Sequence, residues 1–236
     1  MAFGFDPDLS TWSPFHGAVY AVVEAAAKIV ATGGKADAIR LTLQEYFERL
    51  GTDPKKWGKP FAALLGALRA QHELGIPAIG GKDSMSGTFE NLNVPPTLVA
   101  FAAATVHANE VISPEFKYPG NKVLMVPVAH DAQDLPVFER LNRNFEKIHH
   151  LIADQKVFSA QSVGSGGIAA AISKMCLGNN LGFKFTAFFP QEDLFKPLYG
   201  TMLLEVSPSL DVAANLAGTG AVEIGTTRDV PSIITD

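Results

Sequence analysis

The feature that most constrains the fold is one long helix pattern near the N-terminus. Ser13-Pro14 combines a capping side chain with proline at the first helical position, and Gly33-Gly34 ends the pattern. From Phe15 to about Ala31, apolar residues recur at helical spacing. We expect no strand before this helix, an unusual start that suits a naturally short beginning or a piece of a longer chain.

Beyond this helix, the pattern alternates between strands and helices. Up to residue 112 we expect a short helix over Leu43–Leu50, a loop over 51–58, a long helix from near Pro60 to Leu74, a short buried strand at Ala78-Ile79, and a strand over Thr97–Val106 that is covered on both faces. After residue 121 we expect strands at 122–128, 156–160, 182–188, 201–206 and 222–226, with helices at 135–153, 168–177 and 209–217. This order predicts an α/β (α+β) fold.

A turn-rich stretch over 113–121, SPEFKYPGN, is the predicted domain boundary. It divides the chain into an N-terminal domain, residues 1–116, and a C-terminal domain, residues 117–236. A chain of 236 residues with 47% hydrophobic and 18% charged content can bury a core, which excludes disorder.

Charge and cysteine content narrow the partners and the compartment. The net charge is −5 and no basic block is present, so we expect no nucleic-acid partner. The most apolar run, Leu98–Val106, is about half the ~20 residues that span a bilayer, so we expect no membrane partner. We expect no secretory signal in the first ten residues, because they carry two Asp and no Lys or Arg. The single cysteine, Cys176, forms no internal disulfide and suits a reducing, cytoplasmic location.

One segment stands out chemically: Gly80-Gly81-Lys82-Asp83-Ser84-Met85-Ser86. Glycines admit a ligand close to the backbone, and a lysine with hydroxyl and amide donors suits a phosphate. It is no Walker A loop, because Ile76 stands where glycine is required and Asp83 follows the lysine. The two interpretations are a ligand-binding loop and a polar turn.

Other candidates carry less weight. The loop Gly164-Ser165-Gly166-Gly167 before a helix can bind an anion or simply make a tight turn. Glu24 and Lys28 are four residues apart, which suits an ion pair, while Glu24 in a cleft could ligate magnesium. His149-His150 are expected to be packing and surface residues rather than metal ligands, and Cys176 a buried structural thiol rather than a nucleophile.

Three stretches closely resemble phosphoribosylformylglycinamidine synthases. They are QEYFERLGTDPKKWGKPFAALLGA, LGIPAIGGKDSMSGTF and NVPPTLVAFA. The resemblance extends at lower specificity through residues 162–175, LYGTMLLEV and VEIGTT. It implies an aminoimidazole ribonucleotide synthetase-like fold: a partial N-terminal α/β domain that lacks its first strands, then an α/β C-terminal domain.

The resemblance also implies a function. That family is an ATP-dependent carbon–nitrogen ligase of purine biosynthesis, which converts formylglycinamide ribonucleotide (FGAR) to its amidine with glutamine-derived ammonia. The chain looks like the second synthetase half of the large single-chain form. The first synthetase half and the glutaminase domain would be its partners, and ATP and magnesium its cofactors through the complete enzyme. The catalytic histidine belongs to the other half, so no catalytic residue is expected here and the chain alone should be inactive.

Site residues carry over one by one. The resemblance implies that Gly80, Gly81, Lys82, Asp83 and Ser84, together with Gln44, face the FGAR and ATP site of the other half.

Glu24 matches a metal-binding glutamate, but Lys28 stands where the family has asparagine. The segment 161–167, QSVGSGG, lacks both acidic residues of the family pattern His-Asp-x-Ser-Asp-Gly-Gly. We therefore expect magnesium-nucleotide binding in this cleft to be weak or absent.

Two alternatives stay open. The chain could be a non-catalytic half that pairs with the catalytic half and scaffolds the ammonia path. It could also be a stand-alone relative, such as an aminoimidazole ribonucleotide synthetase or a hydrogenase-maturation protein.

Overall fold

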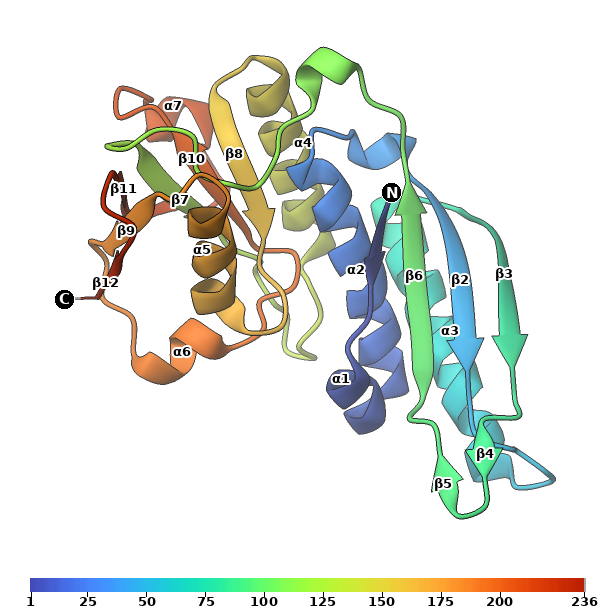
Figure 1. Cartoon of the computed structure of the whole chain (residues 1–236). Helices are drawn as coiled ribbons and strands as arrows, with labels where there is room; N and C mark the ends of the chain where they lie inside the picture. The colour runs from blue at the N-terminus through green and yellow to red at the C-terminus, as the bar shows by residue number, and fades with distance from the viewer. Residues whose placement is uncertain (236) are drawn as a thin grey trace.

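The computed structural model describes residues 1–235 and contains two main sheets with helices packed between them (Figure 1). The first sheet has strand order β1-β6-β2-β3. The N-terminal elements are β1 (Ala2–Gly4), α1 (Pro7–Trp12), α2 (Pro14–Ala31), β2 (Arg40–Tyr46), α3 (Pro54–Leu74), β3 (Ala78–Ser84), β4 (Thr88–Phe89), β5 (Leu92–Asn93) and β6 (Thr97–Ala103). Strands β4 and β5 form a separate small hairpin.

The second sheet has strand order β12-β9-β11-β7-β10-β8. Its elements are β7 (Lys122–Val126), α4 (Phe138–Ala153), β8 (Val157–Ser162), α5 (Gly167–Leu177), β9 (Gly182–Phe185), α6 (Gln191–Phe195), β10 (Met202–Val206), α7 (Val212–Asn215), β11 (Val222–Arg228) and β12 (Ile233–Ile234). All neighbouring pairs are antiparallel except β12 with β9. The mixed α/β class predicted from the sequence is confirmed.

Helix α2 forms as its sequence predicts. The Ser13 side chain accepts a hydrogen bond from the His16 N–H, and Pro14 occupies the first helical position. Helix α2 packs against α3 and covers β1 and β6 on one face of the first sheet. It also contacts α4 and β8, so nearly all of its length is buried between the two sheets (Figure 1).

The prediction that no strand precedes α2 is wrong. Strand β1 pairs antiparallel with β6, in the register Phe3 opposite Phe101. A Cβ at Gly4 would lie 2.1 Å from the Ala21 carbonyl oxygen, so β1 packs directly on α2 and needs glycine there. A strand of three residues is too short to show a period of two in the sequence.

The predicted helix over Leu43–Leu50 is also wrong, because residues 40–46 form β2 in the middle of the sheet. Tertiary pairing with β3 and β6 decides the conformation of this short segment. The predicted loop over 51–58 is partly wrong. Helix α3 begins at Pro54, capped by Asp53, whose side chain accepts from the Lys55 N–H at 2.9 Å.

Two strand predictions need correction. Strand β6 is buried on one face only, since its burial alternates along Thr97–Ala103, whereas both faces were expected to be covered. Strand β3 continues through the predicted loop to Ser84, and most of its residues are exposed because it lies at the sheet edge. Among the described C-terminal elements, α7 is only four residues long, β9 ends at Phe185, and α6 and β12 were not predicted.

One buried carboxylate fixes the segment that joins the two sheets. Glu205 on β10 is fully buried and accepts hydrogen bonds from the backbone N–H groups of Lys117 and Tyr118, from Asn121 Nδ2 and from Ser159 Oγ, all within 3.0 Å. Four donors on one carboxylate satisfy its charge without a cation. The 117–121 segment is therefore held against the C-terminal sheet by hydrogen bonds to Glu205.

No helix within residues 1–235 is long and apolar enough to cross a membrane.

Candidate functional site

The sequence motif at residues 80–84 lies on edge strand β3, where alternation distributes its side chains between two faces. Gln44 pairs with Lys82, and Tyr46 pairs with Ser84, across the parallel β2–β3 ladder. Successive side chains of a strand point to opposite faces. Lys82, Ser84 and Gln44 therefore share the open face of the sheet, the face that α2 and α3 leave uncovered.

The open face holds a compact polar group at its edge. Gln44 Nε2 donates to Tyr46 Oη at 2.8 Å, and Lys82 Nζ lies 5.5 Å from the centroid of the Tyr46 ring. Ser84 Oγ and Ser86 Oγ are 3.1 Å apart. Lys82 forms no ion pair within residues 1–235 and is exposed, so its charge is available to an anionic ligand.

The two glycines of the motif differ in role. A Cβ at Gly81 would lie 2.5 Å from the Leu43 carbonyl oxygen, so Gly81 is required for close strand pairing. A Cβ at Gly80 would meet nothing within 4 Å. Packing inside this chain therefore does not require glycine at position 80, and a ligand or partner that approaches the backbone would account for it.

Asp83 points to the opposite face from Lys82, beside Glu45 of β2. Glu45 is 5% exposed, and its Oε1 has no hydrogen-bond partner in the described part of the chain. Burial, and secondarily the charge of Asp83, raise the pKa of Glu45 to about 7. The Gly80–Ser84 segment thus does not act as one binding loop, because Asp83 is separated from Lys82 and Ser84 by the sheet.

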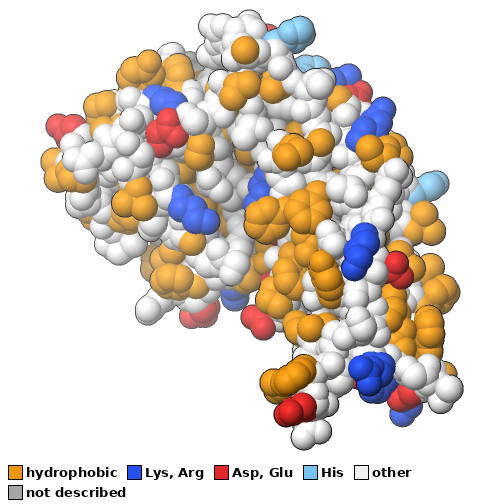
Figure 2. Space-filling model, turned by 45° about the vertical axis from the view of Figure 1, so that its right-hand side comes forward, with side chains coloured by type: hydrophobic (Ala, Val, Ile, Leu, Met, Phe, Trp, Pro, Cys, Tyr) orange, Lys and Arg blue, Asp and Glu red, His pale blue; other side chains and the backbone are white. Residues whose placement is uncertain are grey.

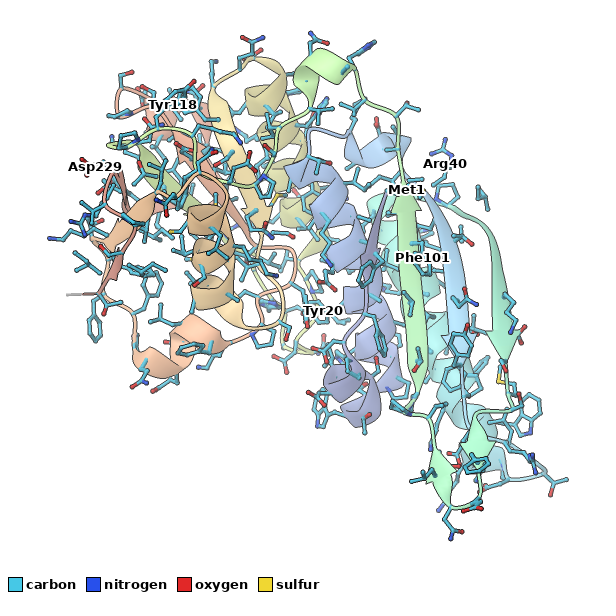
Figure 3. The ribbon with its side chains drawn as sticks, in the orientation of Figure 1. Met1, Tyr20, Arg40, Phe101, Tyr118 and Asp229 are labelled. Atoms are coloured by element: carbon cyan, nitrogen blue, oxygen red, sulfur yellow. The ribbon has the colours of Figure 1, made fainter. Side chains whose placement is uncertain are left out.

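Two exposed aromatic side chains lie on the same open face of the first sheet, on β1 and β6. Phe3 and Phe101 are 56% and 40% exposed, with ring centroids 6.3 Å apart. Figure 2 shows hydrophobic side chains gathered over the N-terminal part of the surface, and Figure 3 labels Phe101 on β6. Clustered exposed aromatic side chains are typical of a surface that another protein segment covers.

The second predicted site lies in a cavity of about 210 Å³ between α2 and the loop that precedes α5. Glu24 is 8% exposed, and Lys28 Nζ lies 2.8 Å from its Oε1. Its Oε2 accepts the Phe5 N–H at 3.0 Å. The buried Ser162 and the glycine loop 164–167 line the same cavity.

This cavity does not fit a magnesium ion. Both oxygens of Glu24 already have partners, one of them a cation, and no second carboxylate lines the cavity. No group of three or more His, Cys, Asp or Glu side chains within residues 1–235 is arranged to hold a metal. We assign no metal to Glu24.

His149 makes a contact between helices, and Cys176 is half-buried where a buried thiol was expected. His149 Nδ1 lies 3.1 Å from the Gly33 carbonyl oxygen, which ties α4 to the end of α2. Burial raises the pKa of the Cys176 thiol to about 11, so it is a poor nucleophile at neutral pH. The sequence analysis missed Glu45, because its burial follows from strand pairing in a segment that was predicted to be a helix. It also missed a second cavity, which is lined by Tyr20.

Comparison with solved structures shows the class of fold to which the chain belongs. The chain has the fold of the aminoimidazole ribonucleotide synthetase-like proteins. It matches T. maritima PurL complexed with FGAR with a TM-score of 0.78 over 99% of this chain and 42% of that chain, at 16% identity. It matches a hydrogenase maturation protein, HypE, with a TM-score of 0.66 over 89% of this chain and 74% of that chain, also at 16% identity.

The proteins that are similar to this chain in sequence narrow the comparison to one kind of enzyme subunit. The PurL subunit of phosphoribosylformylglycinamidine synthase from Picrophilus torridus is 24% identical over 257 aligned positions, which cover 96% of this chain and 32% of the relative. The PurL subunit from Limosilactobacillus reuteri is 26% identical over 83% of this chain and 29% of its own length. No protein-family profile matches the chain. The resemblance to phosphoribosylformylglycinamidine synthase is thus confirmed, and the chain spans about a third of the length of these relatives.

Proposed function

We propose that this chain is the second synthetase half of a phosphoribosylformylglycinamidine synthase and forms one wall of its FGAR and ATP site. The observation that carries the proposal is the grouping of Lys82, Ser84 and Gln44 on an uncovered sheet face. Structures of relatives are described as PurL complexed with FGAR and with ATP, which supports ligands of this kind. The rest of the enzyme would supply the catalytic residues, the ammonia from glutamine, and the site for magnesium.

The chemistry available to these residues is binding and orientation. The Lys82 ammonium and the Ser84 hydroxyl can donate hydrogen bonds to a phosphate or ribose oxygen. The family reaction implied by the resemblance is phosphorylation of the FGAR amide oxygen by ATP, followed by displacement of phosphate by ammonia. Side chains of this wall would hold the ribonucleotide in place for both steps rather than transfer protons. We expect a cytoplasmic location, because a single, half-buried cysteine is typical of a protein made in a reducing compartment.

The first prediction concerns the Ser84 hydroxyl. In the complete enzyme, reconstituted by co-expression of this chain with the missing synthetase half, Ser84→Ala should lower kcat/KM for FGAR about tenfold to a hundredfold, because a substrate oxygen loses its donor. The measurement is FGAR-dependent ATP hydrolysis, with this chain alone expected to show no turnover. Thermal melting should hardly change, since Ser84 is at the sheet edge.

A matched control lies on α5, in the C-terminal part. The exposed Ser173 Oγ donates to the Ala169 carbonyl oxygen, so Ser173→Ala removes a hydroxyl away from the first sheet and should leave kcat/KM within about twofold. An unchanged kcat/KM for Ser84→Ala would instead support the scaffold function.

The scaffold function is the second candidate. It is favoured by the exposed Phe3 and Phe101 on the open sheet face, which suit pairing with the other half, and by the Glu24–Lys28 ion pair, which occupies the chain's own cleft. Under this alternative, the reconstituted enzyme would lose its assembly rather than its FGAR affinity when the sheet face is altered. Gel filtration of Phe101→Glu with the partner half separates the two candidates.

A further inference from the structure

A cavity of about 490 Å³ lies at the opposite end of α2 from Lys28, between α1, α2 and two loops of the C-terminal part. Its walls are aromatic: Trp12, His16, Tyr20, His130 and Tyr199. Figure 3 labels Tyr20 at this junction, on the side of α2 that faces the C-terminal part. The cavity is separate from the open sheet face and from the Glu24 cleft.

Carboxylates complete the lining, and no lysine or arginine of the described chain is among the lining residues. Asp6 is already occupied: it caps α1 through Oδ1, and its Oδ2 accepts from the Tyr199 hydroxyl at 2.5 Å. The exposed carboxylates of Asp8 and Asp134 form no hydrogen bond or ion pair within residues 1–235. The cavity therefore offers two uncompensated negative charges beside aromatic faces.

The aromatic rings that line the cavity, which we call the cage, are inclined to one another. Tyr20 and Tyr199 are 6.0 Å apart at 42°, Tyr20 and His130 are 6.3 Å apart at 44°, and Trp12 and His16 are 5.7 Å apart at 53°. Such angles are ordinary for neighbouring aromatic rings, and they turn the rings of the lining in different directions around the cavity. Two of these rings are held rigidly, because Tyr20 and Tyr199 are 8% and 6% exposed and their hydroxyls bond Asp134 O and Asp6 Oδ2 at 2.5 Å.

We propose that this cavity binds an organic ammonium ion, with the aromatic faces around the head group and Asp8 and Asp134 as its counter-charges. Aromatic faces attract cations through the negative charge of the ring face, and such cages recognise alkylated ammonium groups. A metal ion is a poor alternative, since no three carboxylate or imidazole groups within residues 1–235 converge on one point. Burial and nearby carboxylates raise the pKa of both tyrosines well above the ordinary range, which agrees with a negative local potential.

The ammonium group could belong to a small amine or to a lysine side chain of a protein segment. The test therefore titrates the 236-residue chain with choline, with N-acetyl-lysine methylamide and with 3,3-dimethylbutan-1-ol, the neutral isostere of choline. The chain has two tryptophans, so Trp57→Phe leaves Trp12 in the cage as the single fluorescent reporter. Ring-current shifts of the ligand N-methyl protons give a second readout.

We expect saturable binding of at least one ammonium ligand, at least about tenfold tighter than the neutral isostere. Tighter binding of choline would indicate a small amine as the natural ligand, and tighter binding of N-acetyl-lysine methylamide would indicate a lysine side chain. The double variant Asp8→Asn, Asp134→Asn should weaken binding about tenfold or more without lowering Tm, because both side chains are exposed. Asp229→Asn removes one negative charge far from the cage, as the labels of Figure 3 show, and should leave affinity unchanged.

Equal affinity for choline and its neutral isostere would overturn the proposal, as would the absence of saturable binding by either ammonium ligand at concentrations up to about 50 mM. The same conclusion follows if Asp229→Asn weakens binding as much as the double variant, because the effect would then be general screening.

Discussion

At the scale of single residues, the most unusual group is the Glu45 carboxyl. It is 5% exposed, and its Oε1 lacks a hydrogen-bond partner in the described chain. The residue opposite it on the neighbouring strand is a second acidic residue, Asp83. Burial of a carboxylate without a cation favours the protonated form. Because burial and Asp83 raise its pKa to about 7 in the folded state, folding stability must depend on pH through this group.

The sign follows from the raised pKa. The protonated Glu45 is favoured in the folded chain, so its contribution to stability is complete below the unfolded pKa near 4.5 and is lost as pH rises through about 7. Glu45→Gln mimics the protonated form at every pH. Above pH 8 we expect this variant to be more stable than the parent by about 1–3 kcal/mol, and near pH 4.5 the two should be similar.

Urea unfolding between pH 4.5 and 8.5 measures this difference. Glu146→Gln, an exposed carboxyl on α4, is the matched control and should follow the parent at every pH. A constant difference between Glu45→Gln and the parent across this range would show that Glu45 does not titrate there.

At the scale of elements, the contact between α2 and α3 depends on one glycine. A Cβ at Gly66 would lie 2.1 Å from the Phe15 carbonyl oxygen, a backbone atom that cannot move aside cheaply. Gly58, on the same helix, has nothing within 4 Å of the corresponding position. The two positions separate helix propensity from helix packing.

We expect Gly66→Ala to lower the free energy of unfolding by about 1–3 kcal/mol, because the helices must move apart. Gly58→Ala should raise it by about 0.5–1 kcal/mol, since alanine favours the helix and meets no neighbour. Thermal melting followed by circular dichroism tests both variants. Stabilisation by Gly66→Ala would mean that the two helices are not closely packed.

At the scale of the whole molecule, the two sheets share one core. A continuous cluster of buried side chains includes residues of α2 and the first sheet together with Phe145 of α4 and Met202 of β10. Hydrogen bonds cross the same boundary, from Tyr199 to Asp6 and from Tyr20 to the Asp134 carbonyl. A shared core couples the unfolding of its parts.

We therefore expect one cooperative unfolding transition for the chain. Trp12 and Trp57 report on the N-terminal part by fluorescence, and the single cysteine, Cys176, reports on the C-terminal part through its reaction with a thiol reagent. The two midpoints in urea should coincide, with slow thiol labelling below the transition because the thiol is partly buried. Two separated midpoints would mean that the parts unfold independently.

The sequence by itself determined the elements whose signals are local. Helix α2 follows from Ser13-Pro14, the helical spacing of apolar residues and the glycines after Ala31. Several C-terminal strands and α4 follow in the same way, since their patterns are long enough to show a period. The Gly80–Ser84 motif was identified as the chemically distinctive segment, and the resemblance that it carries was confirmed by the comparisons.

Only the tertiary structure decided the rest. β1 and β2 exist because β6 pairs with both, and neither pattern shows this locally. The structure also divided the motif between two faces, with Lys82 and Ser84 on the open one and Asp83 beside Glu45. The Tyr20 cage joins residues more than a hundred positions apart. Local propensity differs by only about 1 kcal/mol per residue, so long-range pairing and burial override it wherever a segment is short.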